Sequence, residues 1–143
     1  MPERDIEWAH AQWRIMIWED ANLFCHAGVL LRDGEVNGHA ARIGGIGGVM
    51  THPDARHRGH AKAAMSHAAA MLKSELSAAF VLLVCRAEVR PLYAQLGWRV
   101  FPGKLLCEQR GDTVAYTLGA PMLLALHESG PSDGTINLLG QPW

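Results

Sequence analysis

The chain has 143 residues, of which 49% are hydrophobic, and a formal net charge of −1 at pH 7. This length and composition predict a single domain, residues 1–143, with a sizeable packed core, and exclude a disordered chain. The nearly balanced charge gives no sign of nucleic acid or an anionic membrane as the main partner, and we expect neither.

Two apolar, β-prone segments predict a hairpin near the N-terminus. They cover residues 13–18 and 23–32, and the intervening Glu-Asp-Ala-Asn supplies turn residues. Residues 1–12 are mostly polar and predict either a short helix or a disordered lead-in.

A second turn is predicted at residues 33–35, Asp-Gly-Glu, after which residues 36–43 return as a third, antiparallel strand. Four glycines then interrupt the run of apolar residues between positions 44 and 48. Glycines at this density weaken a strand unless a bulge or a closely approaching ligand requires them. This stretch is therefore a candidate for close contact with a ligand.

A short basic loop follows Pro53 and leads into a long alanine-rich segment. The loop and its exit carry three cationic and two small residues: Arg56, Arg58, Lys62, Gly59 and Ala61. Small residues let backbone N–H groups converge at a helix N-terminus, where the helix dipole also favours negative charge. The segment predicts a phosphate-binding turn.

The segment from residue 59 to about residue 76 predicts a helix with one buried face. Its apolar residues recur at three- and four-residue spacing: Ala61, Ala64, Met65, Ala68, Met71 and Leu72. Residues 79–85 then form a continuous apolar run, typical of a strand covered on both sides. A strand–helix–strand unit with a right-handed crossover is expected.

The C-terminal half predicts a short helix and further strands. Pro91 suits the first turn of a helix that ends at Leu96, with Gly97 as its C-terminal cap. We expect three further strands: one at residues 98–101, one at 113–118 that forms a final hairpin, and a short edge strand at 136–139.

Two motifs carry a resemblance to a known family. Arg56-x-x-Gly59-x-Ala61 resembles the pyrophosphate loop of the GNAT family of acyl-CoA-dependent N-acyltransferases, and Leu92-Tyr93-x-x-x-Gly97-Trp98 resembles that family's second motif at the matching distance. The resemblance implies an α/β (α+β) fold. Its sheet would be mixed and mostly antiparallel, with a long helix after the phosphate loop and a second, short helix.

The resemblance also assigns roles to particular residues, with acetyl-CoA as the co-substrate. It implies that backbone amides of the strand before the loop hold the pantetheine and the thioester carbonyl: Val49, Met50 and Thr51. It implies that the loop and helix start hold the pyrophosphate: Arg56, His57, Arg58, Gly59, His60, Ala61 and Lys62. Tyr93 matches the family tyrosine that gives a proton to the departing CoA thiolate.

The general base is where the sequence departs from many family members, which carry a Glu on the strand before the loop. No carboxylate occupies that stretch here. Several groups are alternatives, besides water acting alone: His26, His39, His52, Glu88 and the C-terminal carboxylate of Trp143. The histidines around the loop lack the further ligands that zinc requires, and we expect no metal.

Within the family, the sequence is most similar to aminoglycoside 2'-N-acetyltransferases, although the similarity is patchy. The resemblance implies that the chain lacks the usual first strand and first two helices, which normally wall one side of the acceptor site. We therefore expect a homodimer. Three functions stay open: acetylation of a small-molecule primary amine, aminoglycoside modification, and a non-catalytic acyl-CoA-binding module.

Three cysteines, Cys25, Cys85 and Cys107, are widely spaced and form no Cys-x-x-Cys pair. This pattern encodes neither a disulfide framework nor a thiolate metal site. No apolar stretch reaches the ~20 residues that cross a bilayer, and the N-terminus lacks the pattern of a signal peptide. We expect a cytoplasmic protein.

Overall fold

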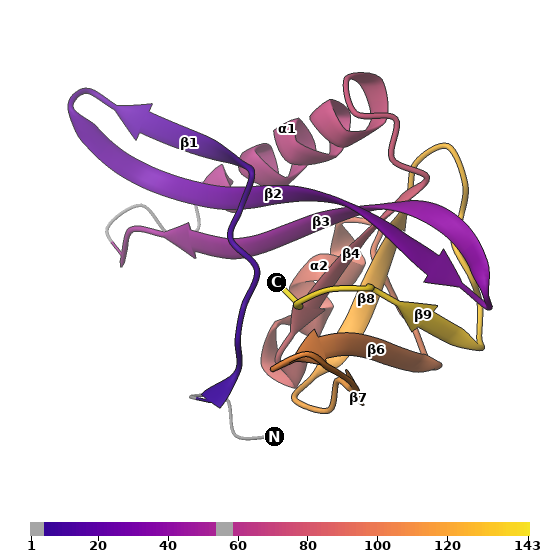
Figure 1. Ribbon diagram of the computed structural model, residues 1–143. Coiled ribbons are helices and arrows are strands. Elements are labelled where there is room, and N and C mark those ends of the chain that lie inside the picture. The colour runs from indigo at the N-terminus through magenta and orange to yellow at the C-terminus, as the bar shows by residue number, and fades with distance from the viewer. Residues whose placement is uncertain (1–4, 54–58) are drawn as a thin grey trace.

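The structure confirms the predicted fold class, a mixed and mostly antiparallel sheet with one long and one short helix. The computed structural model describes residues 5–53 and 59–143, and within these ranges the chain forms nine strands and two α-helices (Figure 1). In chain order the elements are β1 (Trp13–Glu19), β2 (Asn22–Val36), β3 (His39–Thr51), α1 (His60–Ser74), β4 (Phe80–Cys85), the 3-10 helix η3 (Ala87–Val89), α2 (Arg90–Gln95), β5 (Arg99–Val100), β6 (Lys104–Gln109), β7 (Asp112–Ala115), β8 (Ala120–Ala125) and β9 (Thr135–Asn137).

The strands form one sheet in the order β5-β8-β4-β3-β2-β9-β6-β7, with β1 also paired to β2. The pairs β3–β4 and β6–β9 are parallel, whereas the other pairs are antiparallel. A parallel pair needs a crossover connection, which α1 supplies between β3 and β4. The parallel strand–helix–strand unit predicted from the sequence is therefore present. Within the described residues, no helix is long and apolar enough to cross a bilayer.

The first hairpin is confirmed, but the predicted turn at residues 33–35 is wrong. β2 runs through these residues to Val36, and the turn lies at Asn37 and Gly38, whose φ angles are 50° and 82°. Two successive residues with positive φ match the right-handed twist of paired strands, which is why Asn-Gly is favoured in tight hairpins. The third strand consequently begins at His39 and not at residue 36.

The predictions for the first twelve residues are wrong over the described part of that segment. Residues 6–12 form neither a helix nor a disordered lead-in but an extended segment. The Ala9 N–H donates to the Pro142 carbonyl at 2.8 Å, and the Glu7 N–H donates to the Gln109 side chain at 2.8 Å. Hydrogen bonds to distant parts of the chain thus fix a segment whose own composition has no strand pattern.

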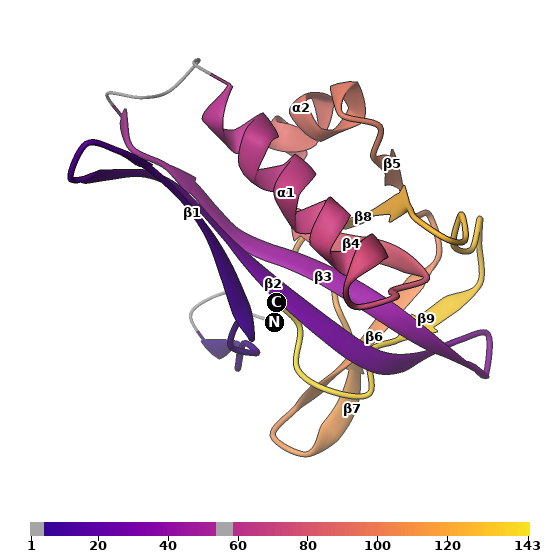
Figure 2. The same ribbon diagram turned by 90° about the horizontal axis from the view of Figure 1, so that it is seen from above.

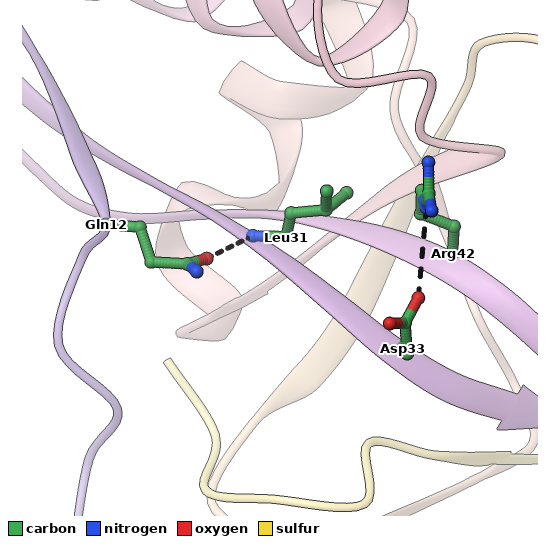
Figure 3. A network of polar contacts seen from close by, with 4 residues as sticks. All are labelled: Gln12, Leu31, Asp33 and Arg42. Atoms are coloured by element: carbon green, nitrogen blue, oxygen red, sulfur yellow. Dashed lines mark hydrogen bonds and ion pairs between the residues drawn. The ribbon is translucent and has the colours of Figure 1, made fainter.

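The side chain of Gln12 hydrogen-bonds to the backbone of β2 between the positions where β1 and β9 pair with this strand. β1 pairs with β2 as far as Val29, and β9 pairs with it only from Glu35. Between these positions the Leu31 N–H donates to Gln12 Oε1 at 2.7 Å (Figure 3). Backbone donors inside a fold need a partner, and this side chain supplies one where no neighbouring strand does. The exposed Arg42–Asp33 ion pair in the same view is 3.8 Å long.

The helix α1 packs against one face of the sheet, as predicted (Figure 2). Four of the six apolar residues predicted for its inner face are buried, namely Ala64, Met65, Ala68 and Leu72, and the other two are half-buried. The close approach requires glycine in the sheet, because a Cβ on Gly44 would lie 3.0 Å from the Leu72 methyl groups. The neighbouring strand β4 is buried as predicted.

The opposite face of the sheet is covered by the C-terminal part of the chain. A second core forms there around Phe101, Leu105, Ile136, Leu138 and Trp143. The predicted edge strand at residues 136–139 is instead β9, which is internal and joins β2 to β6. The sequence analysis predicted no strand at β6. The mostly apolar residues around Met122 form β8, which pairs with both β4 and β5.

Candidate functional site

The central parallel strands separate halfway along their length. β3 and β4 are paired only from Ile43 and Phe80 to Gly45 and Leu82. Beyond this point β4 continues beside β8, and the end of β3 stays paired with β2 through Met50 and Thr51. Because the second half of β3 has lost its β4 neighbour, its backbone borders open space on that side.

The first of two clefts, here called the helix-side cleft, opens at this divergence and has a volume of about 870 Å³. Its walls come from the start of β2, the end of β3, the N-terminus of α1, and α2. It brings together all the predicted cofactor and catalytic residues that the structure describes: Val49, Met50, Thr51, Gly59, His60, Ala61, Lys62 and Tyr93. The predicted residues Arg56, His57 and Arg58 lie outside the described residues.

The N-terminus of α1 has the properties of an anion site. Gly59 is the N-cap residue with φ of 79° and makes no side-chain cap hydrogen bond, and the first turn of the helix contains no acidic residue. A Cβ on Gly59 would have no atom of the described residues within 4 Å. Uncapped N–H groups and the positive end of the helix dipole suit a phosphate group. This end of the cleft can therefore accept an anionic group such as a phosphate.

Two contacts hold the side chain of His60 against the first hairpin. Its ring stacks on Phe24 with centroids 6.0 Å apart, and Nε2 lies 3.6 Å from Glu19 Oε1. The ring of His52 also contacts Phe24, edge-on at 5.8 Å. Both histidines also line the helix-side cleft, and His60 Nε2 makes no hydrogen bond among the described residues.

Tyr93 lies on α2 and is half-buried, with its ring edge-on to Trp98 at 6.3 Å. Burial raises the pKa of its phenol above the ordinary value of 10.0, and the nearby thiols of Cys85 and Cys25 raise it further. The phenol is consequently protonated throughout the neutral pH range. A phenol that keeps its proton at neutral pH can act as a proton donor and not as a base.

A second cleft, here called the C-terminal cleft, lies on the face of the sheet opposite α1 and has a volume of about 520 Å³. It is bounded by the extended N-terminal segment, the glycines of β3, the end of β4 and Trp143. Its aromatic walls include Trp8 and Tyr116, and its cations are Arg14 and Arg86. Among the described lining residues of this cleft, none has a carboxylate side chain.

The candidate bases are distributed unequally between the two clefts. His39 and Glu88 line neither cleft, because His39 begins β3 at the far hairpin and Glu88 lies in η3. His52 lines only the helix-side cleft, and Trp143 lines only the C-terminal cleft. His26 is the one residue in the described ranges that lines both.

Sequence reasoning named His26, Trp143 and the glycines of β3 in this second cleft but missed several of its other residues. Arg14, Arg86 and Tyr116 come from three separate segments and share no motif. No group of three metal-ligating side chains occurs in the part of the chain that the structure describes.

Residues 3–101 match a family model described as an acetyltransferase (GNAT) domain. This range includes β1 to β5, both helices and the divergence of β3 and β4. No curated protein sequence matches the chain significantly.

Solved structures share the fold at low sequence identity. The GNAT family N-acetyltransferase YhbS from Escherichia coli, in complex with CoA, is 15% identical with a TM-score of 0.63, and the match covers 91% of this chain and 68% of that one. The ribosomal-protein-S18-alanine N-acetyltransferase from Escherichia coli is 16% identical with a TM-score of 0.55, covering 82% and 71%.

Other matches differ more in length. The Bacillus subtilis N-acetyltransferase YlbP, in complex with coenzyme A, is 12% identical with a TM-score of 0.57, and the match covers 78% of this chain and 66% of that one. A GCN5-related N-acetyltransferase from Kribbella flavida is 18% identical with a TM-score of 0.56, but the chain spans only 22% of its length.

Proposed function

The chain belongs to the GNAT acetyltransferase family, and from that premise we propose that it is an acetyl-CoA-dependent N-acetyltransferase acting on a primary amine of a small molecule. One observation carries the proposal. Two clefts lie on opposite faces of the sheet and share one lining residue, His26, with Tyr93 in the wall of one of them. Two clefts that share a lining residue can hold two substrates close to each other.

The helix-side cleft is the proposed site for acetyl-CoA. The N-terminus of α1 would bind the diphosphate, and the free edge of β3 at Val49, Met50 and Thr51 would hydrogen-bond the pantetheine. The Val49 N–H is proposed to polarise the thioester carbonyl. A backbone donor fixed in this way stabilises the negative charge that develops on the oxygen during transfer.

Tyr93 is the proposed general acid. Breaking the C–S bond leaves a thiolate, and a protonated phenol beside it supplies the proton. The raised pKa of Tyr93 keeps that proton available at neutral pH. Tyr93 is half-buried, with its ring against Trp98, and it lines the helix-side cleft.

The C-terminal cleft is the proposed site for the amine. Its volume of about 520 Å³ suits a small molecule. The described lining carries the cations Arg14 and Arg86 and no carboxylate side chain, which does not favour a polycationic aminoglycoside. A non-catalytic acyl-CoA-binding module is the second alternative, and no specific feature of the clefts favours it.

The test is release of CoA thiol from acetyl-CoA in the presence of a library of small primary amines, with an aminoglycoside panel included. The proposal expects thiol release that depends on at least one amine, and a product whose mass is increased by one acetyl group. Calorimetry with CoA is run in parallel. Binding of CoA without transfer to any amine favours the non-catalytic module, and transfer confined to the antibiotics favours aminoglycoside modification.

A further inference from the structure

We propose that His26 is the general base that takes a proton from the attacking amine. This inference rests on the proposed function and adds to it the group that the sequence leaves undecided. It starts from a bulge in the β2–β3 pairing. His26 is opposite Met50 and Gly28 is opposite Gly47, so that Gly48 and Val49 together face one residue of β2.

The bulge turns a carbonyl group toward the imidazole. Gly48 has φ of 60°, a conformation that glycine adopts without strain. Its carbonyl oxygen lies 2.9 Å from His26 Nδ1. β-bulges of this kind redirect backbone groups and side chains next to functional sites.

Two contacts fix the same tautomer of His26. A carbonyl oxygen can only accept a hydrogen bond, so Nδ1 carries the proton and donates it to Gly48. The Arg14 guanidinium can only donate, and its Nη1 lies 3.1 Å from Nε2, which therefore accepts. Both partners thus require a neutral imidazole whose lone pair is on Nε2. A histidine held in this form is a competent proton acceptor.

The position of His26 sets it apart from the other ionisable groups around the two clefts. Each of the others among the described residues lines one cleft alone: His10, Arg14, Cys85, Arg86, Tyr116 and Trp143 on one side, and Cys25, His52, His60, Lys62 and Tyr93 on the other. Among the described lining residues of either cleft, none offers an aspartate or glutamate side chain. His26 is therefore the one basic residue in the described ranges that lines both of the proposed substrate sites.

Two side chains account for the protons that move during acetyl transfer. As the amine nitrogen bonds to the acetyl carbon and the C–S bond breaks, Nε2 of His26 takes one proton from the nitrogen. The leaving thiolate takes the phenol proton of Tyr93. The extra proton on His26 and the one missing from Tyr93 are then exchanged with water. Arg14, whose side chain is exposed, must first release Nε2 to the incoming amine.

The test compares His26→Asn with wild type and with His39→Asn. The asparagine amide introduced by His26→Asn can still donate to the Gly48 carbonyl, but it has no basic nitrogen. His39 lines neither cleft, so its variant is the matched control. We expect kcat of His26→Asn to fall about 100-fold, with the Kd for CoA and the Tm unchanged. Added imidazole is expected to restore part of the activity of His26→Gly and to leave wild type unaffected.

The outcomes separate this inference from the proposed function. A kcat for His26→Asn within about twofold of wild type, or a His26→Gly variant that imidazole does not rescue, overturns the role of His26 and leaves the acetyltransferase proposal intact. A wild-type protein that binds CoA but acetylates no amine overturns the proposed function and this inference with it.

Discussion

The indole nitrogen of Trp143 donates a 3.0 Å hydrogen bond to the carbonyl oxygen of Leu82. Leu82 is the last residue of β4 that pairs with β3. The indole lies against Gly45, where a Cβ would collide with the ring. The C-terminal tryptophan thus supplies a partner at the position where the two strands separate, and it forms part of the wall of the C-terminal cleft.

Replacing Trp143 by phenylalanine is expected to lower the free energy of unfolding by about 1–3 kcal/mol, because the buried Leu82 carbonyl loses its donor. Urea denaturation measures the change. Trp18→Phe is the control, since Trp18 is 56% exposed and its loss should cost far less. Equal effects of the two substitutions would show that the hydrogen bond contributes nothing specific.

Local patterns in the sequence account for the elements that were predicted correctly. α1 follows from its helical apolar spacing and β4 from its continuous apolar run. β6 was missed because its buried positions are Leu105, Cys107 and Gln109, and the polar third residue hides the alternation. The Gln109 amide is satisfied by the Glu7 backbone, which is more than a hundred residues away in sequence.

A single role was predicted for a residue of the candidate site only where that residue belongs to a contiguous motif, whereas His26 was one of several alternative bases. The phosphate turn and Tyr93 each belong to a short motif, and the spacing of residues within each motif identifies them. The place of His26 depends on a bulge at Gly48 and on a contact with Arg14 across the first hairpin. These are products of strand register, which the sequence does not display.

Gly59→Asp is expected to weaken CoA binding by at least about tenfold, or ~1.4 kcal/mol. The new carboxylate would occupy the N-cap of α1, where the diphosphate is proposed to bind. Because Gly59 has φ of 79°, aspartate is strained there, and the Tm is expected to fall by about as much as in a glycine-to-aspartate variant at a similar φ elsewhere in the chain. Calorimetry with CoA and thermal denaturation separate the two effects.

The matched control for this substitution is Gly38→Asp. Gly38 has a similar φ of 82°, equally open surroundings, and a place in the far hairpin. It should leave CoA affinity unchanged. Loss of affinity in both variants would point to backbone strain and not to the proposed diphosphate site.

The free energy of unfolding is expected to fall at alkaline pH because buried thiols resist ionisation in the folded chain. Burial raises the pKa of Cys107 above the ordinary value of 9.0. The unfolded chain therefore releases the thiol proton at lower pH than the folded chain does. The stabilisation is complete below pH 9.0 and is lost as the pH rises toward the folded-state pKa.

Urea denaturation at around pH 7.5 and around pH 10 tests this dependence. Cys107→Ala should be less stable than wild type at both values, because Cys107 is fully buried. Its free energy of unfolding should nevertheless fall less between the two pH values. An unchanged slope would show that Cys107 does not contribute to the alkaline loss.

Tyr93 is expected to ionise only above pH 10.0, because burial and the adjacent thiols raise the pKa of its phenol. The chain has two tyrosines, so Tyr116→Phe leaves Tyr93 as the sole phenol. Its ionisation can then be followed directly by the ultraviolet absorbance of phenolate, with circular dichroism confirming that the protein is still folded.

A general acid with this pKa stays protonated through the neutral range. The kcat should therefore show no loss from ionisation of Tyr93 below pH 10.0. The substitution Tyr93→Phe should lower kcat about 100-fold. A phenol midpoint below pH 10.0 would contradict the burial of Tyr93, whereas a normal kcat for Tyr93→Phe would remove it as the proton donor.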